Sequence, residues 1–135
     1  MDLAELEIPE TVQVHLEFPN PKIGKLYDDK GNAMTIDLYS PASNVVVAYK
    51  HRLQREMSVK VGRKGLKGFA DITPEERDKQ EVERLHVFTA SVNNVVFNGK
   101  KVTTETIKEV YADPRYGWIC DQLKEKLGSW EDFLS

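Results

Sequence analysis

Hydrophobic and polar residues alternate strictly in two short stretches of the N-terminal third. Residues 12–18 read Val-Gln-Val-His-Leu-Glu-Phe, and residues 34–38 read Met-Thr-Ile-Asp-Leu. A period of two places the apolar side chains on one face, which is typical of a half-buried strand. Turn residues at 28–32 precede the second stretch. We therefore expect a small N-terminal antiparallel sheet or hairpin, with residues 23–27 as a candidate third strand.

Apolar residues at helical spacing follow the second strand. Ser40-Pro41 is a cap followed by proline, which predicts a helix start. The inner face of this helix is expected to carry Ala42, Val46, Tyr49, Leu53 and Met57. A basic, glycine-rich stretch at 59–70 interrupts the pattern. A capping box at 73–76 then starts a second helix that runs to about Asn93. Its expected apolar stripe consists of Val82, Leu85, Phe88, Thr89 and Val92.

The last third of the chain has the densest apolar pattern. Asn98-Gly99 predicts a turn, and Thr103 or Thr104 caps a short helix. Asp113-Pro114 then opens a helix over 114–127 that ends before Gly128. The stripe of this helix is expected to consist of Tyr116, Ile119, Cys120, Leu123 and Leu127. Residues 129–135 are expected to form a short tail helix.

Together these elements predict one α+β domain over residues 1–135, mostly helical, with four to five helices and a small N-terminal antiparallel sheet. The β-rich part is expected at 1–40, and the helical part, with a glycine-rich basic loop at 59–70, at 41–135. Forty per cent hydrophobic and 30% charged residues fit a soluble domain with its own core. We expect no secretion signal and no membrane span.

Candidate chemistry is sparse. The three histidines are scattered in the sequence, and none has metal-ligand spacing to the single cysteine, Cys120. Cys120 falls on an apolar stripe, which favours a buried structural thiol over a nucleophile. No phosphate-binding, dinucleotide-binding or nucleophile-elbow motif is present. We therefore expect no catalytic residue, no cofactor and no metal, and hence no enzyme.

One stretch is strongly basic although the net charge is −3. Its cations, with a single acid (Glu56) among them, are Lys50, Arg52, Arg55, Lys60, Arg63, Lys64 and Lys67. Such a patch is compatible with a solvated loop, an acidic protein partner or nucleic acid. The acid-rich segment 71–83 is a candidate to neutralise it, and the overall acidity disfavours nucleic acid.

Large aromatic and apolar residues near the C-terminus are candidate partner-binding residues. Trp118 falls nearly opposite the stripe of its helix, so it is either covered by another part of the chain or exposed as an interface anchor. Three more such residues lie within the last six of the chain. The candidate set is Tyr116, Trp118, Trp130, Phe133 and Leu134.

Two blocks of the sequence resemble a known family. The first runs from Phe97-Asn-Gly through residues 103–111 and Asp113-Pro-Arg-Tyr-Gly-Trp-Ile to Trp130-Glu-Asp-Phe-Leu, and the second is residues 36–43, Ile-Asp-Leu-Tyr-Ser-Pro-Ala-Ser. Both are similar to segments of the tail assembly chaperones of long-tailed bacteriophages. The resemblance covers about half of the chain and does not extend to residues 12–30 or to the glycine-rich stretch.

The resemblance implies a non-enzymatic protein of the host cell cytoplasm that is absent from the mature virion. Its partners would be the tape measure protein, which it keeps soluble, and the tail tube protein, which it helps to recruit. Coating of a long client by many copies implies self-association. Two alternatives remain open from the residues: a structural tail or head–tail connector subunit, and a small nucleic-acid-binding regulator.

Overall fold

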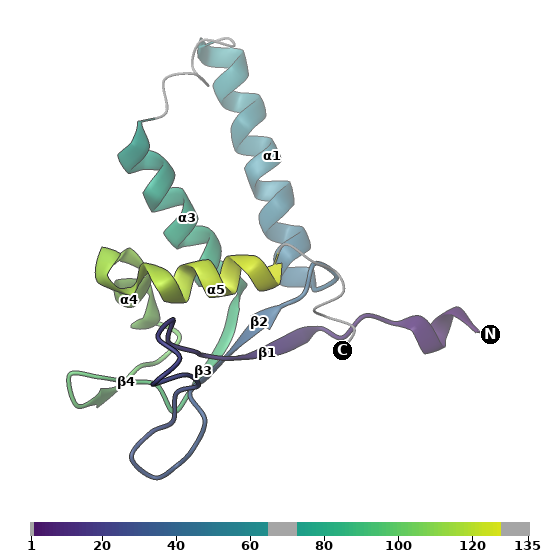
Figure 1. The fold of residues 1–135 in the computed structure, drawn as a ribbon. Helices are drawn as coiled ribbons and strands as arrows, with labels where there is room; N and C mark the ends of the chain where they lie inside the picture. The colour runs from purple at the N-terminus through teal and green to yellow at the C-terminus, as the bar shows by residue number, and fades with distance from the viewer. Residues whose placement is uncertain (1, 65–72, 128–135) are drawn as a thin grey trace.

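The computed structural model describes residues 2–64 and 73–127, with the backbone alone for 59–64. In chain order its elements are η1 (Leu3–Leu6), β1 (Thr11–His15), β2 (Thr35–Tyr39), α1 (Asn44–Lys64), α3 (Pro74–Phe88), β3 (Thr89–Asn93), β4 (Val96–Phe97), β5 (Lys100–Lys101), α4 (Ile107–Ala112), η2 (Pro114–Tyr116) and α5 (Gly117–Leu127). The described residues thus form an α+β fold with four α-helices and a small antiparallel sheet (Figure 1).

The three-stranded sheet has the order β1-β2-β3, with both pairs antiparallel. The predicted N-terminal antiparallel sheet is thus confirmed in part, because β1 and β2 come from the N-terminal third but the third strand comes from residues 89–93. Residues 23–27 take part only in isolated bridges, Glu17 with Lys25 and Tyr27 with Ala33. The irregular connection between β1 and β2 therefore lies outside the sheet, and the helical part predicted at 41–135 contributes strands as well.

The second predicted helix is shorter than expected. It begins at Pro74 as predicted, and the Thr73 hydroxyl accepts a hydrogen bond from the Glu76 amide at 3.2 Å. It ends at Phe88, because Thr89 takes an extended conformation and its segment pairs with β2. Val92 then lies opposite Ile36 on the apolar face of the sheet. The apolar residues of 82–92 fit a helical stripe, yet strand pairing decides the conformation of 89–93.

Helix α1 differs from its prediction at both ends. It begins at Asn44, where the Val46 amide donates to the Ser43 hydroxyl at 3.2 Å, rather than at Pro41. It continues to Lys64, so residues 59–64 are helical and not part of a loop, while 65–70 lie outside the described residues. A glycine inside a helix costs only about 1 kcal/mol, which does not by itself end it. Ala42 and Met57, expected on the inner face, are exposed.

The main hydrophobic core lies between the apolar face of the sheet and helices α3, α4 and α5. Its fully buried centre includes Leu16, Ile36, Leu38, Leu85, Ile107 and Leu123. A second, smaller cluster of Val46, Tyr49 and Phe88 joins α1 to α3, and the Tyr49 and Phe88 rings meet edge to face at 5.6 Å. The α1–α3 pair rises from one end of the sheet (Figure 1). Only its base is fixed by buried apolar contacts among the described residues.

Most of the predicted local signals in the last third are confirmed. Asn98 and Gly99 both have positive φ, of 52° and 77°, as the two-residue turn of the β4–β5 hairpin requires. Helix α4 begins at Ile107 with Thr106 as its N-cap, so the predicted cap at Thr103 or Thr104 lies two or three residues too early. Thr103 and Thr106 exchange hydrogen bonds between hydroxyl and amide just before the helix. Asp113 caps η2, after which α5 buries the predicted residues Ile119, Cys120 and Leu123. Residues 128–135, with the predicted tail helix, lie outside the described part.

Candidate partner-binding surfaces

Trp118 on α5 is half-buried against the segment that follows β1. Its ring meets Phe18 edge to face, with ring centroids 5.2 Å apart, and it packs on the rim of the main core. The chain therefore covers one side of the indole and leaves part of it accessible to solvent. A rigid aromatic group with one face supported and the other open is a common form of interface anchor.

Tyr116, the last residue of η2, is likewise half-buried just before α5. Its ring meets Phe97 of the β4–β5 hairpin edge to face at 5.3 Å, and the Arg115 guanidinium lies 5.9 Å from the ring centroid. Arg115 in turn binds both carboxylate oxygens of Asp113, which lowers the pKa of that carboxyl below its usual range. The Asp-Pro-Arg-Tyr turn thus holds a half-buried aromatic ring in a fixed orientation.

Helix α5 is held to the sheet by a side chain that the sequence did not single out. The amide of Gln122 donates to the His15 carbonyl and accepts from the Glu17 backbone N–H, both at 3.1 Å. It pairs with the end of β1 in the way a neighbouring strand would. No sequence pattern marks this residue, because the contact joins positions more than 100 residues apart. The link joins the end of β1 to the helix that carries Trp118.

The described part of the predicted basic patch lies along α1. Lys50, Arg52 and Arg55 are exposed, and Arg52 pairs with Glu83 of α3 at 2.5 Å and with Glu56 at 3.9 Å. The acid-rich segment therefore neutralises one cation of the patch within the fold, as expected. Lys60, Arg63 and Lys64 lie in the last part of α1, where the structure describes only the backbone. Lys67 lies outside the described residues.

Cys120 is a buried thiol, as its place on the apolar stripe predicted. It lies 3.6 Å from the Tyr111 carbonyl, and burial raises the pKa of the thiol above its ordinary value. A hollow of about 260 Å³ between α3 and α5 reaches it, rimmed by the acids Asp78, Glu81 and Asp121. A thiol that stays protonated at neutral pH is a poor nucleophile, so this arrangement favours a packing role.

Two histidines serve as hydrogen-bond donors to backbone carbonyls. His15 Nε2 lies 2.8 Å from the Leu26 oxygen, and His86 Nε2 lies 2.8 Å from the Thr104 oxygen. A carbonyl only accepts, so each Nε2 carries a proton. Within residues 2–64 and 73–127, no three His, Cys, Asp or Glu side chains are grouped to hold a metal ion. Over the same residues, no helix is long and apolar enough to cross a membrane.

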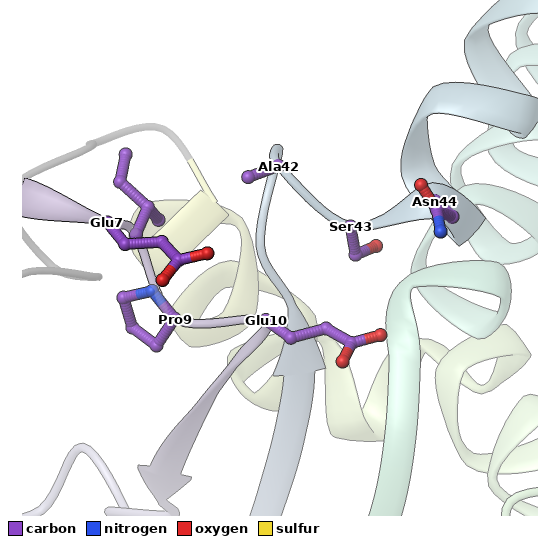
Figure 2. A pocket seen from close by; sticks show the side chains of 7 residues that line it. Glu7, Pro9, Glu10, Ala42, Ser43 and Asn44 are labelled. Carbon is purple, nitrogen blue, oxygen red and sulfur yellow. The ribbon is translucent and has the colours of Figure 1, made fainter. Parts of the chain in front are cut away.

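An open hollow of about 730 Å³ lies where the N-terminal segment meets the start of α1 (Figure 2). Glu7, Pro9 and Glu10 line one side, and Ala42 to Asn44 line the other. The Glu10 carbonyl accepts a hydrogen bond from the Ser40 amide at 2.7 Å, which fixes the base of the segment. Residues 2–7 beyond this point are exposed.

Tyr116 and Trp118 lie two residues apart where η2 passes into α5, and they pack on different elements, Phe97 and Phe18 respectively. The basic residues that the structure describes lie on α1. The other three candidate partner-binding residues, Trp130, Phe133 and Leu134, lie outside the described part of the chain. Comparison of the chain with known protein families, with curated proteins and with solved structures finds no match.

Proposed function

We propose that the protein is a non-enzymatic tail assembly chaperone of a long-tailed bacteriophage. In this proposal it binds the tape measure protein and keeps it soluble in the host cell cytoplasm, helps to recruit tail tube subunits, self-associates, and is absent from the mature virion. The observation that carries the proposal is the sequence resemblance of the block from Phe97 to Leu134, which contains the Asp113-Pro-Arg-Tyr-Gly-Trp-Ile segment.

The geometry of that segment supports a binding role. Tyr116 ends η2 and Trp118 lies in the first turn of α5, and each ring meets a ring from another part of the chain while part of its surface stays open. A half-buried aromatic ring that rests on another part of the fold is suited to anchor the apolar face of a client helix. The exposed length of α1 adds a charged surface to the same molecule.

Co-expression with a candidate tape measure protein tests the proposal. The fraction of soluble client should rise when the chaperone is present. Trp118→Ala should lower this fraction, while the purified variant should still unfold in a single cooperative urea transition. Tyr27→Ala is the control, because Tyr27 is an exposed aromatic residue on the connection between β1 and β2. Equal client solubility with and without the wild-type chain would refute the proposal.

Two further measurements separate the alternatives. A structural tail or connector subunit would be found by mass spectrometry in purified virions, whereas the chaperone would not. A nucleic-acid-binding regulator would bind DNA or RNA with a steep dependence on salt concentration through Lys50 and Arg55. The pairing of Arg52 with two glutamates leaves fewer free cations on α1 for such a contact.

A further inference from the structure

We propose that the N-terminal segment Asp2–Glu10, here called the arm, docks onto the outer face of α1 in a second copy of this chain. The proposal deepens the self-association included in the proposed function and rests on it in that respect. It names the two surfaces that meet and the chemistry that brings them together.

The arm carries two exposed leucine side chains among acidic residues. Leu3 and Leu6 lie on the 3₁₀ helix η1, and residues three apart eclipse one another in such a helix. Their side chains are 83% and 57% exposed. Four acids and no base occupy residues 2–10, and all four are exposed: Asp2, Glu5, Glu7 and Glu10. The two leucines thus give the arm an exposed apolar ridge that a partner can cover.

The outer face of α1 has the complementary character. Helical geometry turns Val47, His51 and Arg55 away from the buried stripe of Val46, Tyr49 and Leu53, and it places Lys50 between that stripe and Val47. Val47 is exposed, and among the described residues neither Lys50 nor Arg55 forms an ion pair. The one acid of this stretch, Glu56, faces Arg52 on the other side of the helix. An acidic ridge with exposed leucines therefore matches a basic face with an exposed valine.

The direction of the arm favours contact with another copy. It runs out from the start of β1, away from α1 of its own chain (Figure 1). Its base is fixed by the Ser40–Glu10 backbone hydrogen bond, so a contact within the chain would require the arm to reverse near Pro9. Each copy keeps one free arm and one free α1, and such a head-to-tail contact can continue from copy to copy.

Sedimentation of the full chain without any client measures the contact. The weight-average mass should rise with protein concentration, and the association should weaken in high salt because it pairs opposite charges. Leu3→Ser with Leu6→Ser should weaken association by about tenfold or more. Ile23→Ser is the matched control, because Ile23 is 58% exposed and lies outside the arm. A wild-type chain that stays monomeric, or an equal loss with Ile23→Ser, would overturn the proposal.

Charge reversal tests the partner surface. Lys50→Glu with Arg55→Glu should abolish the concentration dependence, and adding Glu5→Lys with Glu7→Lys should restore it. Oxidation of a Leu6→Cys, Val47→Cys chain should then give disulfide-linked dimers and larger species. A linked monomer would place the arm on its own α1 and overturn the proposal, as would equal dimer yield from an Ile23→Cys, Val47→Cys chain. All these readouts omit the client, so failure here leaves the client-solubility result standing on its own.

Discussion

The hydroxyl groups of Thr89 and Tyr111 meet where α3 passes directly into β3. Thr89 Oγ1 lies 2.7 Å from the Leu85 carbonyl and 2.8 Å from the Tyr111 hydroxyl. The carbonyl only accepts, so the single hydroxyl hydrogen of Thr89 goes to Leu85, and the Tyr111 hydroxyl must donate to Thr89. Both side chains are buried. This chain of two bonds joins the helix end, the first residue of the strand and α4.

Thr89→Val keeps the shape of the side chain but leaves the buried Tyr111 hydroxyl without its acceptor. An unsatisfied buried polar group costs about 1–3 kcal/mol, whereas a normal hydrogen bond contributes about 0.5–1.5 kcal/mol net. Thr89→Val should therefore destabilise by about 2 kcal/mol and Tyr111→Phe by about 1 kcal/mol. The double variant should be no less stable than Thr89→Val alone, because the second substitution removes the orphaned hydroxyl.

Urea unfolding of the four proteins, followed by circular dichroism, gives the complete double-mutant cycle. Thr11→Val serves as the control, because Thr11 is an exposed residue of an edge strand and its substitution should change stability by less than about 0.5 kcal/mol. The reasoning is refuted if Thr89→Val is as stable as the wild type. It is equally refuted if the costs of the two single substitutions simply add in the double variant.

Three further outcomes are expected. Burial raises the pKa of both Cys120 and Tyr111, so these two groups ionise in the unfolded chain before they ionise in the folded one as the pH rises. Their contribution to the free energy of unfolding should be complete below about pH 9 and should be lost above it, less steeply in Tyr111→Phe. Urea midpoints measured at increasing pH test this. Gln122→Ala should lower the free energy of unfolding by about 1–3 kcal/mol, because it leaves two backbone groups at the end of β1 without their hydrogen-bond partner. Gln122→Glu should have an intermediate stability, because it keeps the acceptor, and equal stability of the wild type and both variants would contradict the link. The buried contacts of α1 lie near its start, around Val46 and Tyr49. In hydrogen exchange, the backbone amides beyond Leu53 should therefore exchange faster than those near Val46, and equal protection along the helix would contradict this.

Local patterns were sufficient for elements whose sequence signal and tertiary environment agree. The alternation in 12–18 and 34–38 predicted β1 and β2, and the stripe through Ile119 and Leu123 predicted α5. The proline-containing caps at Thr73 and Asp113 also lie where they were expected. In each case the apolar face that the period defines is the face that the core covers.

The failures have a common cause in distant contacts. Residues 89–93 fit the helical stripe of α3, but β2 offers them a pairing edge that only the tertiary fold provides. Thr89 and Val92 are β-branched, and this was the one local signal for a strand. The Gln122 bridge has no local signal at all. The half-burial of Tyr116 and Trp118 likewise depends on contacts made in the tertiary fold, with Phe97 and Phe18, and the partner-binding role of the two residues stays a prediction.

The position of β3 affects how the chain folds during synthesis. Until residue 93 has left the ribosome, β2 lacks one of its two neighbours, and α4 and α5, which cover the apolar side of the sheet together with α3, have not yet been made. Covering that side also requires α5, whose Gln122 closes the edge at β1. During most of its translation the nascent chain therefore exposes apolar side chains and an unpaired strand edge, which favour aggregation. Completion of the fold is coupled to emergence of the same C-terminal helix that presents Trp118.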